Sequence, residues 1–250
     1  MLSNSPRISV CIATFNGEKY IGQQLDSICE QLSACDEIII SDDGSTDGTL
    51  DVVRDYHDPR IIILEHKDKF AKFKNDYVTH NFENALMHAE GEIIFLSDQD
   101  DVWLPNKVER MVDALKYNDV VMSDCSMTDS SLNIVHKSYF TTERNFKQSI
   151  FYNFVKPSFL GSCMAFRKCV LDQALPFPKY GVGHDLWLGL VGMTLYRFFF
   201  INEPLILYRR HNSSVTDGGK VNNTSLWFKI RYRAYVLLAL YRLFMMKNNK

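Results

Sequence analysis

Three short apolar runs, each ending in a cluster of polar residues, constrain the fold of this chain more than any other feature. The runs cover residues 7–14, 37–41 and 92–97, and the clusters that end them are TFNG from Thr14, DDGS from Asp42 and DQDD from Asp98. Strands that are apolar throughout, rather than alternating, are typical of a parallel sheet whose two faces are covered by helices. The runs therefore predict buried parallel strands.

Helical patterns separate these runs. Residues 18–32 place Ile21, Leu25, Ile28 and Leu32 on one helical face, and shorter helical patterns follow in residues 50–56, 78–89 and 105–115, the last opening at a proline. The alternation predicts a doubly wound α/β fold, with a mostly parallel sheet and helices on both faces. Ligands of such folds bind at the carboxyl ends of the strands, so the three polar clusters are expected to form one site.

The second half of the chain is less regular. Its patterns predict strands over residues 120–123, 159–166, 198–201 and 205–208, and a short helix over residues 185–191. We expect one domain over residues 1–225, followed by a separate helix over residues 226–250.

Charge and cysteine content narrow the function classes. The net charge of −2 argues against a protein that coats nucleic acid. The six cysteines form no CxxC pair, and Cys11 and Cys163 lie in apolar runs, which favours free thiols in a reducing compartment. Arg7 interrupts the N-terminal segment before any apolar leader forms, and no stretch of 18 apolar residues occurs, so a cytoplasmic protein is expected.

Each of the two acidic clusters can be interpreted either as part of a binding site or as an ordinary turn. Asp98, Asp100 and Asp101 would repel one another unless a cation neutralises them, and Mg²⁺ or Mn²⁺ is the natural partner of such oxygen ligands. The alternative is a solvated acidic turn. Asp42 and Asp43 would either accept hydrogen bonds from a nucleobase or a ribose, or belong to a tight turn after which Ser45 or Asp47 caps the next helix.

The segments SVCIATFNGEKYIGQQLDSI, EIIISDDGSTDGT and ENALMHAEGEIIFLSDQDDVW together resemble the N-terminal half of family 2 glycosyltransferases, which are inverting enzymes of GT-A fold. The resemblance covers residues 7–115 strongly. Beyond them, GHDLWL and YRRHNSSVT are similar to acceptor-side segments of the family. The resemblance implies a nucleotide-sugar-binding half over residues 1–115 and an acceptor-side half over residues 116–225.

The resemblance also implies a role for each matching residue. The nucleotide-sugar contacts that it implies are Thr14, Asn16, Glu18, Asp42, Asp43, Asp98 and Arg210. The metal ligands that it implies are Asp98, Asp100 and His211, with Mg²⁺ or Mn²⁺ as the cofactor. Asp185 matches the general base of the family. The residue before it departs from the family's usual Glu-Asp pair, and His184 is also chemically able to accept a proton.

The activity implied is the metal-dependent transfer of a sugar, with inversion, from a nucleoside-diphosphate sugar to a hydroxyl of a saccharide or lipid-linked saccharide. A UDP-sugar is the expected donor and a dTDP-sugar the alternative, in the assembly of a cell-surface polysaccharide such as O-antigen or capsule.

Two other functions fit parts of the sequence. IIFLSDQDDV also fits a haloacid-dehalogenase-type phosphohydrolase with Asp98 as nucleophile, and a carbohydrate-binding protein without catalysis would need no metal.

The last predicted helix differs from the rest of the chain in charge. Residues 226–250 contain six basic residues and no acidic one, whereas the remaining chain has 22 basic and 30 acidic residues. Its apolar core is too short to span a bilayer. We expect peripheral association with an anionic membrane surface, and an ordinary packed helix is the alternative.

Overall fold

The computed structural model describes residues 6–66, 74–142, 145–179, 181–211 and 226–248. The strands in these residues are β1 (Ile8–Thr14), β2 (Glu37–Asp42), β3 (Ile61–Glu65), β4 (Ile93–Asp98), β5 (Val102–Trp103), β6 (Val120–Thr128), β7 (Ile134–His136), β8 (Met164–Arg167) and β9 (Phe198–Arg209). The helices are α1 (Glu18–Cys29), α2 (Thr49–Asp55), α3 (Lys74–Met87), α4 (Lys107–Leu115), α5 (Tyr139–Thr142), α6 (Ile150–Val155), α7 (Lys168–Ala174), α8 (His184–Leu195) and α9 (Leu226–Asn248).

The strands form one mixed, mostly parallel sheet in the order β3-β2-β1-β4-β8-β6-β9-β5, with β7 paired to β6. The strands β3, β2, β1 and β4 are parallel to one another. β8 lies between β4 and β6 and is antiparallel to both, and β9 is parallel to β6. The side chains of the central runs are buried throughout, as the apolar pattern predicts. The doubly wound fold is thus confirmed.

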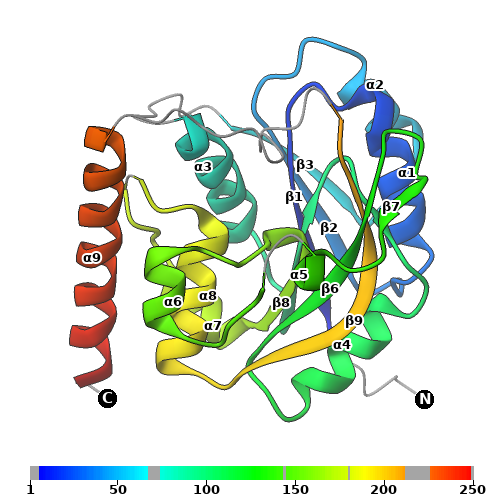
Figure 1. Cartoon of the computed structure of the whole chain (residues 1–250). Helices are drawn as coiled ribbons and strands as arrows, with labels where there is room; N and C mark the ends of the chain where they lie inside the picture. Colours follow the sequence, from blue (N-terminus) through cyan, green and yellow to red (C-terminus); the bar gives the residue numbers. More distant parts are fainter. Residues whose placement is uncertain (1–5, 67–73, 143–144, 180, 212–225, 249–250) are drawn as a thin grey trace.

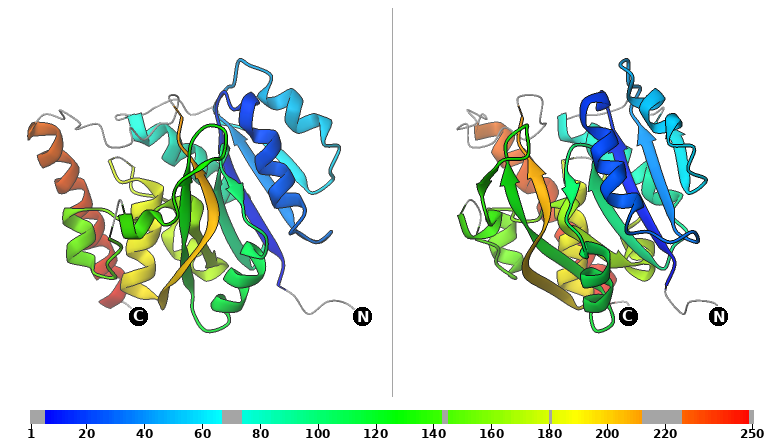
Figure 2. Two further views of the ribbon diagram at one scale, coloured as in Figure 1. Left: turned by 45° about the vertical axis from the view of Figure 1, so that its right-hand side comes forward. Right: turned by 90° about the vertical axis from the view of Figure 1, so that its right-hand side faces the viewer.

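Helices flank this sheet (Figure 1). The amphipathic pattern of α1 is confirmed, because Ile21, Leu25 and Ile28 are fully buried. α2 packs on α1, whereas α3 packs on β1 and β2 and lies near α8 on the other side of the sheet. α9 packs on α8 at the outer side of the molecule (Figure 2).

Several element boundaries differ from the sequence-based expectation, and β6 in particular extends to Thr128 rather than ending at residue 123. The run 159–166 is not one strand, because a short 3₁₀ turn, Gly161–Cys163, precedes β8. The two strands expected over 198–201 and 205–208 are a single strand, β9, which passes a pairing irregularity with β6 near Pro204. Helix α4 begins at Lys107, after Asn106 in a left-handed conformation (φ 67°), so the proline lies in the preceding turn.

All six cysteines are free thiols, as expected, and Cys11, Cys125 and Cys163 are buried. None of the helices in the described residues combines the length and hydropathy that a membrane span needs. Residues 212–216 of the YRRHNSSVT segment and Lys250 of the basic tail lie outside the described residues.

The segment that follows α1 is held to the turn before β3 by the side chain of Arg60. The Arg60 guanidinium donates to the Leu32 carbonyl at 2.8 Å and lies 2.6 Å from the Asp58 carboxylate. Both side chains are less than a fifth exposed. The hydrogen bonds from Arg60 lower the pKa of Asp58 to about 2.

Arg60→Met should lower the free energy of unfolding by about 1–3 kcal/mol, because it leaves partly buried acceptors without a donor. Arg54→Met is the matched control, since Arg54 and its partner Asp51 are both mostly exposed and exposed pairs contribute about 0–1 kcal/mol. Chemical denaturation of both variants measures the difference. Equal midpoints for the two variants would contradict this assignment.

Candidate active site

The polar clusters meet at one edge of the sheet. Pairing places Thr14 opposite Asp42, and Ala13 opposite Asp98, so the loops after β1, β2 and β4 are neighbours. The far end of β9 reaches the same edge, where the Arg209 side chain donates to the carbonyl of Asp100 at 2.8 Å. The prediction that these three clusters converge at the carboxyl ends of the strands is confirmed.

Asp42 shapes the loop after β2. Its carboxylate is 2% exposed and accepts the backbone N–H groups of Gly44 (2.9 Å) and Ser45 (2.8 Å) and the hydroxyl of Thr14 (3.0 Å). Gly44 takes a left-handed conformation (φ 79°) in this turn. The adjacent Asp43 is less enclosed, with its carboxylate 3.1 Å from the imidazole of His66. Of the two expected ribose and base contacts, Asp43 is the more accessible.

Asn16 and Glu18 are exposed and join the loops after β1 and β2. The amide oxygen of Asn16 accepts the backbone N–H of Thr46 at 2.8 Å, and the carboxylate of Glu18 accepts that of Gly48 at 3.0 Å. Asn16 itself has a φ of 48°. The two expected nucleotide contacts therefore also hold the shape of the site.

Gln99 joins the loop after β4 to the loop after β1. Its side-chain amide accepts the backbone N–H of Phe15 at 2.9 Å and donates to the Phe15 carbonyl at 3.0 Å. A Cβ on Gly17 would lie 2.4 Å from the Gln99 oxygen, so this approach needs a glycine. Sequence reasoning gave no role to Gln99, because a lone amide inside an acidic cluster carries no pattern.

The carboxylates after β4 lie in a site that disfavours their charge. Burial, then the charges of Asp100 and Asp185, raise the pKa of Asp98 to about 7. Asp101 is fully buried, and burial with the charges of Asp100 and Asp98 raises its pKa well above the ordinary value. One Asp101 oxygen accepts the backbone N–H of Arg209 at 3.0 Å, and the other has no hydrogen-bond partner.

Lys107 is a functional candidate that sequence reasoning missed. Its side chain is fully buried, its ammonium donates to the Ser162 carbonyl at 2.8 Å, and it lies 4.2 Å from the centre of the Trp103 ring. Burial lowers its pKa to about 8, while its positive charge favours the ionised form of Asp98. The sequence feature that could have indicated the burial of Lys107 is its position four residues before Met111, on the same helical face.

The end of β9 and the residues after it bring Arg209 and His211 to the acidic cluster. His211 lies 2.7 Å from the Asp100 carboxylate, and its ring packs against Tyr20. Arg210 is half-buried beside Tyr208. Arg209, the neighbour of the expected phosphate contact Arg210, is 3% exposed. The structure thus joins the expected metal ligands Asp100 and His211.

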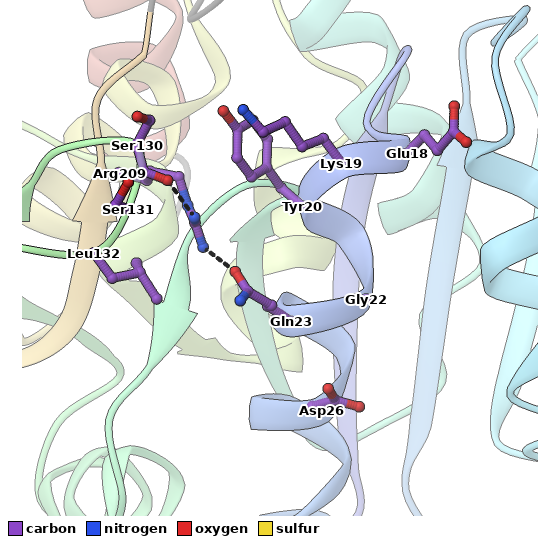
Figure 3. A pocket seen from close by; sticks show the side chains of 10 residues that line it. All are labelled: Glu18, Lys19, Tyr20, Gly22, Gln23, Asp26, Ser130, Ser131, Leu132 and Arg209. Carbon is purple, nitrogen blue, oxygen red and sulfur yellow. Dashed lines mark hydrogen bonds between the residues drawn. The ribbon is translucent and has the colours of Figure 1, made fainter.

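Arg209 links four segments of the chain. Its guanidinium donates to the carbonyls of Asp100 (2.8 Å) and Ser130 (2.9 Å) and to the side chain of Gln23 (2.7 Å), and it stacks over Tyr20. The contacts border a cavity of about 410 Å³ between α1 and the turn before β7 (Figure 3). Of the expected nucleotide contacts, only Glu18 lines this cavity.

Asp185 and His184 begin α8. Asp185 is half-buried in the first helical turn, where a carboxylate is favoured by the helix dipole, and one oxygen accepts its neighbour's backbone N–H at 2.7 Å. The His184 ring stacks on Phe82 with ring centres 4.1 Å apart, and burial lowers its pKa. A Cβ on Gly161 would lie 2.7 Å from His184 Nε2.

The residues after β4 fit a divalent cation in charge and chemistry. Among the described residues, no three His, Cys, Asp or Glu side chains are gathered into a complete ligand set. Mg²⁺ is usually held by one or two carboxylates together with substrate phosphates, so a full protein cage is not required. The raised pKa of Asp98 and the unpartnered Asp101 oxygen are the features that a nearby cation would relieve.

Arg209→Met should lower the free energy of unfolding by about 2–4 kcal/mol, because several buried acceptors lose their donor at once. The matched control is Arg110→Met, since Arg110 and its partner Glu203 are both about half exposed. Thermal and chemical denaturation measure both variants. An Arg209 variant as stable as the Arg110 variant would show that Arg209 does not hold these segments together.

Comparison with known proteins agrees with this geometry. Residues 9–175 match the family model described as glycosyl transferase family 2. The chain is 28% identical to the dTDP-rhamnosyl transferase RfbG of Shigella flexneri over 243 residues, which make up 89% of this chain and 77% of RfbG.

Two solved structures share the fold. The chain matches TarS of S. aureus, in complex with UDP-GlcNAc, with a TM-score of 0.64 and 20% identity over 86% of this chain and 62% of that one. It matches the mannosyltransferase PcManGT of Pyrobaculum calidifontis, in complex with GDP-Man and Mn²⁺, with a TM-score of 0.59 and 25% identity over 87% of this chain and 59% of that one. The chain thus spans about three-fifths of each solved chain.

These findings confirm the GT-A-like fold and decide between the functions that the sequence left open. The family match covers β2, β3, β4 and all of β1 except Ile8, together with the loops after them, and it ends before α8 and β9. It therefore favours neither a phosphohydrolase nor a binding protein without catalysis. Because the family model covers more than half of the chain, this protein belongs to glycosyl transferase family 2 and is a glycosyltransferase.

Proposed function

We propose that this protein transfers a sugar, with inversion, from a nucleoside-diphosphate sugar to a hydroxyl of a saccharide or lipid-linked saccharide, in the assembly of a bacterial polysaccharide. The single observation that carries the proposal is the meeting of the Asp98–Asp101 cluster with Asp43 and with the first turn of α8 at one sheet edge. A UDP-sugar is the proposed donor, and a dTDP-sugar is the alternative that similarity to RfbG supports.

The donor nucleotide would lie across the loops after β1 and β2. Asp43 offers a carboxylate to the base or ribose, while Asp42 holds the turn that presents it. Thr14, Asn16 and Glu18 would form the floor and rim of this part of the site. Arg210 would pair with the diphosphate, since a guanidinium binds phosphate oxygens in a bidentate manner.

Asp98 and Asp100, with His211, would hold Mg²⁺ or Mn²⁺ together with the diphosphate. The cation would supply positive charge against the charge that grows on the leaving diphosphate. The bound Mn²⁺ of PcManGT supports this choice. Lys107 lies beneath the cluster and Arg209 beside it, so both would help to hold the carboxylates in place.

Asp185 is the proposed general base. Its charge contributes to the raised pKa of Asp98, which supports a position for Asp185 near the proposed diphosphate site. It would remove the proton from the acceptor hydroxyl as that oxygen attacks the anomeric carbon, and the configuration would invert in one step. His184 is the less suitable base, because its ring is stacked on Phe82.

Residues 1–115 would bind the donor and residues 116–225 the acceptor, within one domain. Asp185 and His211 both belong to the second half, so the reaction would take place between the two halves. The place of action that we propose is the cytoplasm, where nucleotide sugars are available as donors.

Excess EDTA should abolish transfer, and added Mn²⁺ or Mg²⁺ should restore it. Asp100→Asn should lower kcat/KM by about 10²-fold or more, because a metal-bound diphosphate is stabilised by several kcal/mol. Asp113→Asn on the exposed side of α4 is the control and should retain activity. Donor hydrolysis and transfer assays measure both. Full turnover in excess EDTA would refute the metal role.

Asp185→Asn should lower the rate of transfer by about 10²–10⁴-fold, the usual contribution of a general base, while nucleotide affinity stays near wild type. Isothermal titration with UDP and a transfer assay separate the two effects. His184→Ala is the comparison variant and should retain more activity than Asp185→Asn. If the His184 variant is the inactive one, the base is misassigned.

A further inference from the structure

The outward surface of α9 is apolar along its length. Val236, Ala239 and Leu243 are buried against the rest of the protein, and α8 is their neighbouring helix. Among the side chains described on α9, the large apolar ones exposed by 45–74% are Trp227, Ile230, Leu237, Leu238, Tyr241, Phe244 and Met245. At 100° per residue these seven fall within an arc of about 120°, directly opposite the buried side.

The basic residues of α9 line the two borders between these surfaces. Arg231 and Arg242 lie on one border, and Arg233 and Lys247 on the other. Arg242 donates to the Pro176 carbonyl at 2.8 Å, and Arg233 donates to the Val155 carbonyl at 3.3 Å at the end of α6. This arrangement explains why the sequence shows no simple amphipathic helix: α9 has two apolar faces, with its charges between them.

An exposed apolar surface of this extent indicates that α9 binds a partner that covers it, since soluble monomers rarely expose so many large apolar side chains together. A second copy of this chain is a poor cover. A symmetric pair would bring two basic helices face to face, and residues 226–250 contain no acidic residue to pair with them. An anionic lipid bilayer, whose surface is negatively charged and whose interior is apolar, complements both the basic residues and the exposed apolar side chains of α9.

We propose that α9 binds the surface of an anionic lipid bilayer, with the helix parallel to the membrane plane. The seven apolar side chains would enter the region between headgroups and acyl chains, and the basic residues on the two borders would bring positive charge to the level of the lipid phosphates. The acidic remainder of the chain is repelled by the same lipids, so α9 alone would face the membrane.

This orientation has a consequence for the site. α9 begins at the end of the molecule where the strands β1 and β4 finish (Figure 1). A bilayer along α9 would therefore extend past the carboxyl edge of the sheet on the side of α3 and α8. A lipid-linked acceptor would reach the first turn of α8 from that side, which deepens the proposed function by naming the carrier surface.

Trp227 makes the binding directly measurable in the full-length protein. The chain has three tryptophans, of which Trp103 and Trp187 are at most 2% exposed and Trp227 is 74% exposed. Vesicles of phosphatidylcholine with phosphatidylglycerol should shift the emission of Trp227 to shorter wavelength. Pure phosphatidylcholine vesicles should give a much smaller shift, and high salt should weaken the binding because it screens the charges.

Two variants and a control identify the surface responsible. Leu238→Glu should abolish vesicle binding, whereas Tyr117→Glu, at an even more exposed position after α4, should retain it. Arg231→Gln should weaken binding to anionic vesicles about fivefold, since a basic residue near an anionic surface contributes about 1 kcal/mol. Circular dichroism and UDP titration without lipid should be unchanged in all three, so that failure of the membrane proposal and of the transferase proposal can be distinguished.

Three results would overturn the proposal. They are an unchanged Trp227 emission with anionic vesicles, equal binding to neutral and anionic vesicles, and equal binding by wild type and Leu238→Glu. A dimer in light scattering that Leu238→Glu dissociates, with no response to vesicles, would instead identify a second copy as the cover of α9.

Discussion

The repulsion among three carboxylates at the end of β4 organises much of this structure. Asp98, Asp100 and Asp101 lie within four residues of one another, and burial makes the ionised forms of Asp98 and Asp101 costly. Lys107 from α4 and Arg209 from the end of β9 bring positive charge to the cluster, and the imidazole of His211 lies 2.7 Å from the Asp100 carboxylate. The late strand β9 is thereby tied to the site that the first four strands build.

Side-chain hydrogen bonds also hold the neighbouring loops after β1, β2 and β4 in place. The Asp42 carboxylate accepts backbone hydrogen bonds within its own turn, and this turn leaves Asp43 accessible. Gln99 joins the loop after β4 to the loop after β1. A donor would therefore meet loops that are already held in place, and little conformational entropy would remain to be lost on binding. α8 adds Asp185 at its first turn, from the other half of the chain.

The sequence predicted the parts of the site that repeat a local pattern, and it missed those whose role depends on distant partners. Thr14, Asp42 and Asp98 are found where apolar strands end, so their convergence follows from strand order. Arg209 looks like an ordinary strand end until folding places Asp100, Ser130 and Gln23 around it. The burial of Lys107 could have been noticed from its helical spacing, but its nearness to the carboxylates could not.

The sequence by itself determined where β1, β2 and β4 lie along the chain, the helices between them, the edge at which a ligand would bind and the charge of the last helix, because periodicity and strand-end chemistry are local properties. Tertiary structure alone decided that 159–166 is not one strand, that β9 is continuous, and that α9 carries a second apolar face. These outcomes depend on which surfaces the folded core leaves uncovered, and packing between segments far apart in the chain sets that.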